Sequence, residues 1–141
     1  DIDGANPLSL GRLSVGQPAF APATARSVIE ILEHYRIPLS GQHVAVVGRS
    51  AVVGKPLAQL LLQRDATVSI CHSKTVDLGR ITKSASVIVM AVGRANLLTA
   101  NEAGETSVVI DVGTNVNAEG KLVRRQALEE DEYLKLVCDA N

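Results

Sequence analysis

The sequence is poor in aromatic residues: its 141 positions include one Phe, two Tyr and no Trp. A core built on aromatic side chains is therefore excluded, although 46% of the residues are hydrophobic and a core can form. Val, Ile, Leu and Ala must carry the packing. Because the length is close to the usual size of one domain, we expect a single domain with an aliphatic core.

Cysteine is also scarce, and Cys71 and Cys138 stand far apart in the sequence. Neither belongs to a C-x-x-C pair, and no histidine cluster accompanies them. This pattern argues against a zinc site and against a disulfide framework. We expect no bound metal and a reducing, cytoplasmic environment.

Neither charge sign dominates, since 14 Lys and Arg residues face 15 Asp and Glu residues for a formal net charge of -1. The cations are scattered, so the basic stripe typical of nucleic-acid binding is missing. No apolar run approaches the ~18 to 20 residues that span a bilayer, and no charged-then-apolar leader is present. We expect a soluble protein that binds neither nucleic acid nor membrane.

The most informative segment present is VAVVGRSAVVGKP, residues 44–56. An apolar strand stops at Gly48 and is followed directly by an amphipathic helix, with Pro56 tolerated in the first helical turn. The free N–H groups of such a first turn and the positive end of the helix dipole favour an anion. A nucleotide cofactor is the natural candidate.

Short apolar runs alternate with helical patterns along the chain. Val/Ile runs without in–out alternation are typical of parallel strands buried on both faces, and right-handed crossovers join such strands into an open sheet. We predict an α/β fold with a mostly parallel, doubly wound, Rossmann-like sheet and helices on both faces. The predicted strands are 44–47, 67–71, 87–92 and 108–112, and the predicted helices are 24–37 with Thr24 as N-cap, 53–64, 76–83 and 125–137. Residues 1–21 show no regular pattern and are expected to be irregular, with the domain proper at 22–141.

Ligands of an open parallel sheet bind off the carboxyl ends of the strands, so the residues that follow each strand are the site candidates. A single glycine there serves a plain turn equally well, but three of the four strand exits begin with glycine. The candidates are Gly48, Arg49, Ser50 and Val53 after the first strand, His72, Ser73 and Lys74 after the second, Gly93 and Arg94 after the third, and Gly113, Thr114 and Asn115 after the fourth.

The dinucleotide fingerprint G-x-G-x-x-G is not met, because its second and third glycines are replaced by Ser50 and Val53. A site for NAD would carry Asp or Glu about twenty residues after the first glycine to hold the ribose 2′-hydroxyl. His72, Ser73 and Lys74 stand there instead and suit a 2′-phosphate, to which Arg49 adds a possible bidentate contact. The sequence thus favours NADP over NAD.

Structural alternatives stay open for these residues. Arg49 and Lys74 also fit as solvated surface charges, and His72 fits as a hydrogen-bonded structural histidine. Asp111 lies inside an apolar strand and needs a partner such as a backbone N–H or a hydroxyl. The chain shows no Ser-His-Asp order and no carboxylate pair, so we expect it to supply binding rather than acid–base chemistry.

Four segments in the right order resemble the bifunctional methylenetetrahydrofolate dehydrogenase/methenyltetrahydrofolate cyclohydrolase family: DIDGANPLSLGRL (1–13), GRSAVVGKP (48–56), ATVSICHSKT (66–75) and VVIDVGTN (108–115). The resemblance implies an NADP-binding half of a homodimeric folate enzyme. It implies that Gly48, Arg49, Ser50, Ser73 and Thr114 line the cofactor site. It also implies that residues 1–21 come from the side of the folate cleft, where Asp3 holds the pterin end of the substrate.

The sequence also departs from that family. The family's catalytic lysine and its tyrosine partner lie in an N-terminal domain that these residues do not include, and residues 121–141 match the family's closing Pro/Gly-rich segment poorly. We therefore expect no catalytic residue in this chain, binding of NADP, and little cyclohydrolase activity.

Two alternatives are a non-catalytic nucleotide-binding module and an S-adenosylmethionine-binding domain, although His72 and Ser73 argue against the second.

Overall fold

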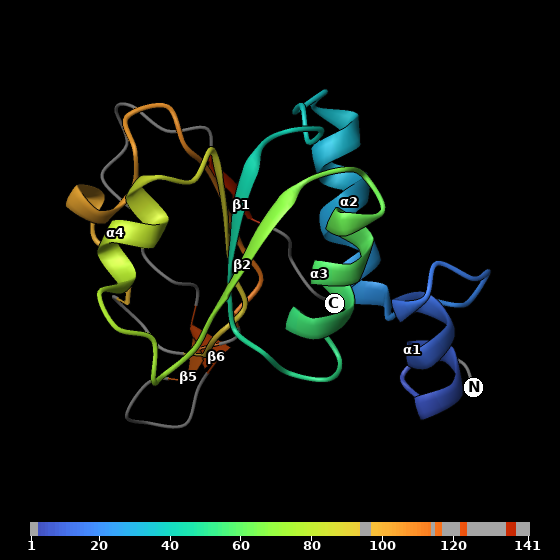
Figure 1. Ribbon diagram of the computed structural model, residues 1–141. Coiled ribbons are helices and arrows are strands. Elements are labelled where there is room, and N and C mark those ends of the chain that lie inside the picture. The colour runs from blue at the N-terminus through green and yellow to red at the C-terminus, as the bar shows by residue number, and fades with distance from the viewer. Residues whose placement is uncertain (1–2, 94–96, 114, 117–121, 124–134, 138–141) are drawn as a thin grey trace.

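The computed structural model describes residues 3–93, 97–113, 115–116, 122–123 and 135–137. Its centre is a five-stranded sheet in the order β2-β1-β3-β4-β7, in which every pair of neighbours is parallel. The strands are β1 His43–Val47, β2 Thr67–Cys71, β3 Val87–Met90, β4 Val108–Asp111 and β7 Lys135–Val137. The helices are α1 Pro7–Ser14, α2 Ala23–His34, α3 Gly54–Leu62 and α4 Leu78–Lys83, with a 3-10 turn η1 at Ala100–Glu102. Figure 1 shows α4 on one side of the sheet and α2 and α3 on the other. The predicted doubly wound α/β fold is confirmed.

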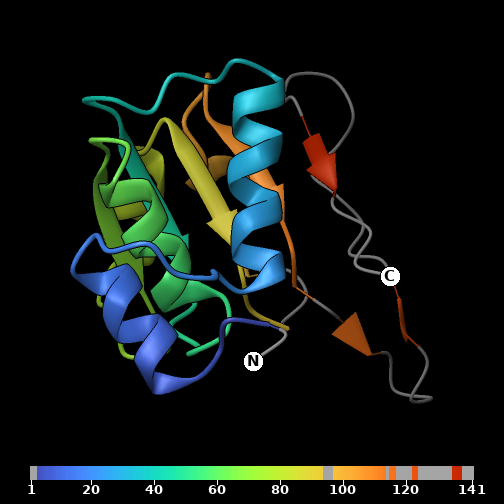
Figure 2. The ribbon, with the colours of Figure 1, turned by 90° about the vertical axis from the view of Figure 1, so that its right-hand side faces the viewer.

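The central strand β1 is buried on both faces. Val44 and Val46 pack into the core under α2 and α3, whereas Ala45 and Val47 pack into the core under α4. All four are at most 1% exposed. This explains why the strand has no polar alternation. Helices α2 and α3 cover one face of the sheet (Figure 2) and α4 lies on the other (Figure 1), so each side chain must be apolar.

Helices α2 and α3 form the larger core with the sheet. Val28 and Leu32 of α2 and Leu57 and Leu61 of α3 are fully buried against the valines of β1 and β3. These positions follow the spacing of one helical face, which is why the apolar pattern predicted both helices. No helix among the described residues is long and apolar enough to cross a membrane.

The expectation that residues 1–21 are irregular is wrong, because α1 occupies Pro7–Ser14. Its start carries two local signals: the side chain of Asn6 accepts a hydrogen bond from the Ser9 N–H at 2.8 Å, and Pro7 stands at the first helical position. Leu13 is buried, and its carbonyl accepts a hydrogen bond from Gln63 Nε2 at 2.9 Å. The segment is therefore held against α3.

The start of α2 also differs from the prediction. The helix begins at Ala23 with Pro22 at its N-cap position, so Thr24 is not the cap. The carboxylate of Asp3 accepts the Ala23 N–H at 3.2 Å and satisfies that donor from twenty residues away. A tertiary contact replaces the local cap here. The other predicted helices and strands up to β4 have ends within two residues of the observed ones.

The C-terminal prediction is wrong where the structure describes it. Lys135–Val137 form β7 and pair with β4, so these residues do not belong to a helix. The free edge of β4 offers unpaired N–H and C=O groups, and a short parallel strand satisfies them. Asn115–Val116 and Leu122–Val123 form a further antiparallel pair, β5 and β6. The rest of the predicted helix, residues 125–134, lies outside the described residues.

Candidate functional site

The strand exits lie side by side at the carboxyl edge of the sheet, at the bottom of Figure 1. The Gly48 N–H donates to the Cys71 carbonyl at 2.8 Å, which joins the exits of β1 and β2. The Ala91 N–H donates to the Val47 carbonyl at 2.8 Å, and the Val112 N–H to the Met90 carbonyl at 2.9 Å. Since the chain leaves β1 toward α3 on one face and leaves the neighbouring strand β3 toward η1 on the other face, this edge contains the switch point of the sheet.

Close backbone packing explains two glycines at this edge. Gly48 is buried and has φ +134, and a Cβ on it would lie 2.6 Å from the Ala91 carbonyl oxygen. A Cβ on Gly54 would lie 2.0 Å from the Gly48 carbonyl oxygen. Glycine at both positions lets the start of α3 lie directly against the end of β1.

The donors at the start of α3 are not all free, which corrects the expectation drawn from the sequence. The Ser50 hydroxyl accepts the N–H groups of Val53 at 3.1 Å and Gly54 at 3.4 Å, and the Ser50 carbonyl accepts the Lys55 N–H at 3.0 Å. The N–H groups of residues 49–52 have no hydrogen-bond partner among the described residues. Anion-binding donors are therefore those of the loop itself, ahead of the helix.

The exit of β2 is a compact turn. The Thr75 N–H donates to the His72 carbonyl at 2.9 Å, and the His72 N–H donates to Thr75 Oγ1 at 2.8 Å. The Lys74 N–H donates to His72 Nδ1 at 3.2 Å, so the imidazole carries its proton on Nε2. His72 thus has the structural hydrogen bond that the sequence left open, while Ser73 and Lys74 are exposed.

Arg49 and Lys74 bring positive charge to this edge. Both are exposed and form no ion pair with any described carboxylate. No acidic side chain follows β2 before Asp77, which caps α4 by accepting the Arg80 N–H at 3.4 Å. The site therefore has unneutralised positive charge where an acidic residue would stand in a site for an unphosphorylated ribose.

The exits of β3 and β4 are also close together. Gly93 is exposed, and a Cβ on Gly113 would lie 2.2 Å from the Val92 carbonyl oxygen. Asp111 accepts the Gly113 N–H at 2.9 Å, which confirms the expected backbone partner for this half-buried carboxylate. Thr114 and Arg94 lie outside the described residues.

Cys71 ends β2 beneath this edge and is fully buried. Burial raises the pKa of its thiol, because removal from water disfavours the thiolate. The thiol is therefore a protonated packing group rather than a nucleophile. Among the described residues no group of three or more His, Cys, Asp and Glu is arranged to hold a metal ion.

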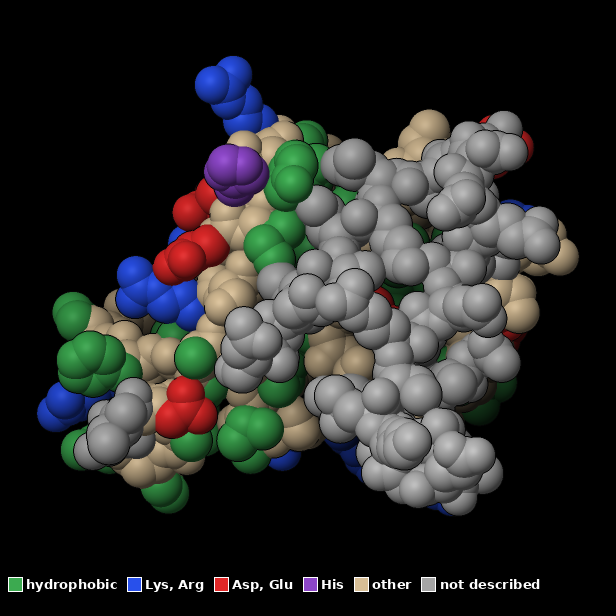
Figure 3. Space-filling model, turned by 180° about the vertical axis from the view of Figure 1, so that it is seen from behind, with side chains coloured by type: hydrophobic (Ala, Val, Ile, Leu, Met, Phe, Trp, Pro, Cys, Tyr) green, Lys and Arg blue, Asp and Glu red, His purple; other side chains and the backbone are tan. Residues whose placement is uncertain are grey.

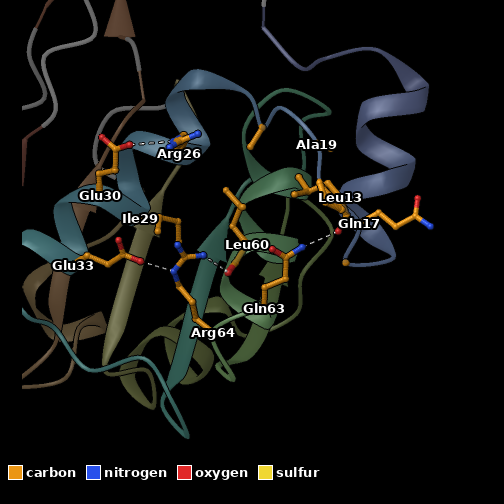
Figure 4. Close-up of a pocket in the computed structure, with 13 residues that line it drawn as sticks. Leu13, Gln17, Ala19, Arg26, Ile29, Glu30, Glu33, Leu60, Gln63 and Arg64 are labelled. Atoms are coloured by element: carbon orange, nitrogen blue, oxygen red, sulfur yellow. Dashed lines mark hydrogen bonds and ion pairs between the residues drawn. The ribbon is translucent and has the colours of Figure 1, made fainter.

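A cavity of about 400 Å³ lies elsewhere, between α1, α2 and α3 (Figure 4). Leu13, Ile29 and Leu60 lie at its base, and two ion pairs at its rim join Arg26 to Glu30 at 3.1 Å and Arg64 to Glu33 at 2.7 Å. None of the predicted site residues lines it. Exposed ion pairs of this kind contribute little to stability and do not indicate a ligand.

Charges of both signs share the surface. In Figure 3, basic and acidic side chains lie next to each other on the described part of the rear face. Asp3, predicted to bind substrate, lies at the start of α2, where its carboxylate holds the Ala23 N–H. That contact gives Asp3 a structural role, and its substrate role stays a prediction.

One residue of the site, Thr75, was not predicted from the sequence. A hydroxyl three residues after the histidine that follows the strand is nevertheless a recognisable turn signal. The role of the Ser50 hydroxyl was also not predicted. Ser50 lies three residues ahead of the N-cap Val53, and its hydroxyl accepts the N–H groups of Val53 and Gly54.

Comparison with known proteins identifies relatives of the chain. Residues 22–132 match the family model for the tetrahydrofolate dehydrogenase/cyclohydrolase NAD(P)-binding domain. "Bifunctional protein FolD 1" of Paenarthrobacter aurescens is 66% identical over 123 residues, which are 87% of this chain and 42% of that protein. "Bifunctional protein FolD" of Arthrobacter globiformis is 65% identical over 122 residues, or 86% and 42% of the two chains. The chain thus spans less than half the length of these curated relatives.

Solved structures agree with these matches. The bifunctional FolD methylenetetrahydrofolate dehydrogenase/cyclohydrolase of Campylobacter jejuni superposes with a TM-score of 0.88 at 36% identity, covering 99% of this chain and 51% of that one. The Trypanosoma brucei enzyme, solved with NADP and an inhibitor, gives a TM-score of 0.84 at 29% identity with the same coverage.

Proposed function

Because the chain belongs to the tetrahydrofolate dehydrogenase/cyclohydrolase family and matches its NAD(P)-binding domain, we propose that it is the NADP-binding part of a folate enzyme. The whole enzyme oxidises 5,10-methylenetetrahydrofolate to the 5,10-methenyl compound and hydrolyses that to 10-formyltetrahydrofolate. The observation that carries the proposal is the carboxyl edge of the sheet, where four strand exits meet next to Arg49 and Lys74, which have no ion-pair partner among the described residues.

The residues present fit a dinucleotide. Gly48 and Gly54 let the start of α3 lie directly against the end of β1. The N–H groups of the loop 49–52 have no partner among the described residues and are available to phosphate oxygens. Ser50 and Val53 shape that loop, and Gly93, Gly113 and Thr114 are proposed to border the site on the side of β3 and β4. When bound, NADP supplies the acceptor for the hydride of the methylene carbon.

NADP fits better than NAD because of the exit of β2. The hydroxyl of Ser73 and the charge of Lys74 face solvent there, and Arg49 follows the neighbouring strand. A guanidinium and an ammonium bind a 2′-phosphate strongly, whereas they leave a 2′-hydroxyl without a carboxylate acceptor. His72, whose Nε2 carries the proton, can donate a further hydrogen bond. The NADP complex of the Trypanosoma brucei neighbour supports this choice.

The chain's own contribution to hydride transfer is orientation. Holding the nicotinamide against the methylene carbon converts an encounter of two molecules into a reaction within one complex. Asp3 is proposed to hold the pterin end of the folate. Hydrolysis needs an acid–base group that we do not find here, so cyclohydrolase activity is proposed only for the whole enzyme.

The division of the chain is also a proposal, with residues 1–21 on the folate side and 22–141 as the cofactor domain. The start of the family match at residue 22 supports it. A homodimer is proposed from the family resemblance, and a cytoplasmic location from the scarcity of cysteine and the free thiol of Cys71.

The test measures NADP reduction driven by 5,10-methylenetetrahydrofolate in the protein that carries this chain. Arg49→Ala is expected to raise the KM for NADP about tenfold while kcat changes less than twofold, because Arg49 holds the cofactor and does not touch the reacting carbon. Lys83→Ala is the control, since Lys83 is an equally exposed cation at the end of α4. Absence of reduction with native protein, or equal effects of the two substitutions, contradicts the proposal.

A further inference from the structure

We propose that Thr75 is a positioning residue that gives the cofactor site its preference for a ribose 2′-phosphate. It acts by holding the turn of residues 72–75, which presents Ser73 and Lys74. The inference rests on the proposed function, because it assumes that a dinucleotide binds at the carboxyl edge.

The turn is closed from within by three hydrogen bonds. Thr75 takes part in two of them, as donor to the His72 carbonyl at 2.9 Å and as acceptor of the His72 N–H at Oγ1 at 2.8 Å. The third joins the Lys74 N–H to His72 Nδ1 at 3.2 Å. Two side chains take part in these bonds, those of His72 and Thr75. His72 is a proposed cofactor contact and Thr75 is not, so Thr75 can be altered without removing a proposed contact.

The turn is also fixed to the sheet. Cys71 pairs with Val47 in register, and its carbonyl accepts the Gly48 N–H at 2.8 Å. Arg49 and the turn therefore leave neighbouring strands next to each other. A phosphate held between Arg49 and Ser73 needs these two residues at a fixed separation. Ser73 lies in a turn and not in a helix or strand, and the Thr75 hydroxyl holds that turn in place.

Loss of the hydroxyl leaves the half-buried His72 N–H without its acceptor and frees the turn to change shape. Ser73 and Lys74 must then become ordered when the cofactor binds, and the free-energy cost of that ordering weakens the affinity for the 2′-phosphate that they contact. NAD lacks the 2′-phosphate, so its affinity does not depend on these side chains. Thr75 thus affects the preference between the cofactors more than binding in general.

The experiment measures the Kd values of NADP and NAD for the full chain by equilibrium dialysis. Thr75→Val keeps the shape of the side chain and removes the hydroxyl. It is expected to raise the Kd of NADP about tenfold and to change the Kd of NAD less than twofold. Thr75→Ser restores the hydroxyl and is expected to return NADP affinity to within about twofold of the native value. Thr67→Val, at the start of β2, is the matched control and leaves both Kd values unchanged.

Both Kd values come from one preparation, so misfolded protein does not affect their ratio. If Thr75→Val does not fold, Thr75→Ala is judged by the same ratio. Equal weakening of NADP and NAD, or failure of Thr75→Ser to restore NADP binding, overturns the inference and leaves the proposed function standing. Failure of the native chain to bind either cofactor instead removes the proposed function, and the inference with it.

Discussion

At the scale of single residues, the carboxyl edge depends on positions where backbone meets backbone. Gly54 lies so close to the Gly48 carbonyl that a Cβ there would stand 2.0 Å from its oxygen. The strand–turn–helix pattern predicted Gly48 as a site residue but did not single out Gly54. The hydrogen bonds of the Ser50 and Thr75 hydroxyls were not predicted either, because each depends on the position of a backbone N–H that folding brings within reach.

Gly54→Ala is expected to lower the free energy of unfolding by roughly 3 kcal/mol, because the added methyl group meets backbone that cannot move aside. Gly11→Ala is the control: Gly11 lies in α1 with nothing within 4 Å of the new Cβ. That change is expected to stabilise by about 0.5 to 1 kcal/mol. Urea unfolding of both variants checks the pair, and equal effects would refute the packing argument.

Cys71 gives a pH dependence whose sign follows from burial. Its pKa in the folded chain is raised above the ordinary thiol value of about 8.5, so the folded state keeps the proton longer than the unfolded state. Its contribution to stability is full below the unfolded pKa and is lost as pH rises through the folded pKa. The test compares two proteins that both carry Cys138→Ser, one with Cys71 and one with Cys71→Ala. Between neutral and alkaline pH, the free energy of unfolding should fall more in the protein that keeps Cys71. An identical fall in the two proteins would show that the thiol is not the cause.

At the scale of elements, α3 connects the parts of the molecule. It follows β1 directly, packs against α2 and β2, and receives α1 through the hydrogen bond from Gln63 to Leu13. The apolar spacing along residues 53–64 predicted this helix, because a continuous core selects one face. The start of α1 and the strand β7 were not predicted, since their evidence is a capping contact and a free sheet edge rather than a periodic pattern.

Two adjacent leucines of α3 test its orientation. Leu61 is fully buried and Leu62 is 51% exposed. Leu61→Ala is expected to lower the free energy of unfolding by about 2 to 5 kcal/mol through lost burial and the cavity left behind. Leu62→Ala is expected to change it by no more than about 0.5 kcal/mol. Thermal and urea unfolding measure both, and a larger loss at Leu62 would place the wrong face of the helix in the core.

At the scale of the whole molecule, the sheet order carries the functional argument. The order β2-β1-β3-β4-β7 brings the ends of β1, β2, β3 and β4 to one edge, and this gathering was predictable because parallel strands share a carboxyl side. The individual contacts between the strand exits were not predictable. The hydrogen bond from Gly48 to Cys71 and the absence of a described counterion for Arg49 and Lys74 come from the structure alone.

Calorimetric titration of the chain with NADP and with NAD, each at low and at high salt, tests the central claim most directly. The account predicts at least tenfold tighter binding of NADP at low salt, because charge-assisted contacts to the 2′-phosphate are absent with NAD. The difference should shrink as salt screens the exposed cations at the edge. Equal affinity for the two cofactors at both salt concentrations, or binding of neither, would contradict a cofactor site at the carboxyl edge that recognises the 2′-phosphate.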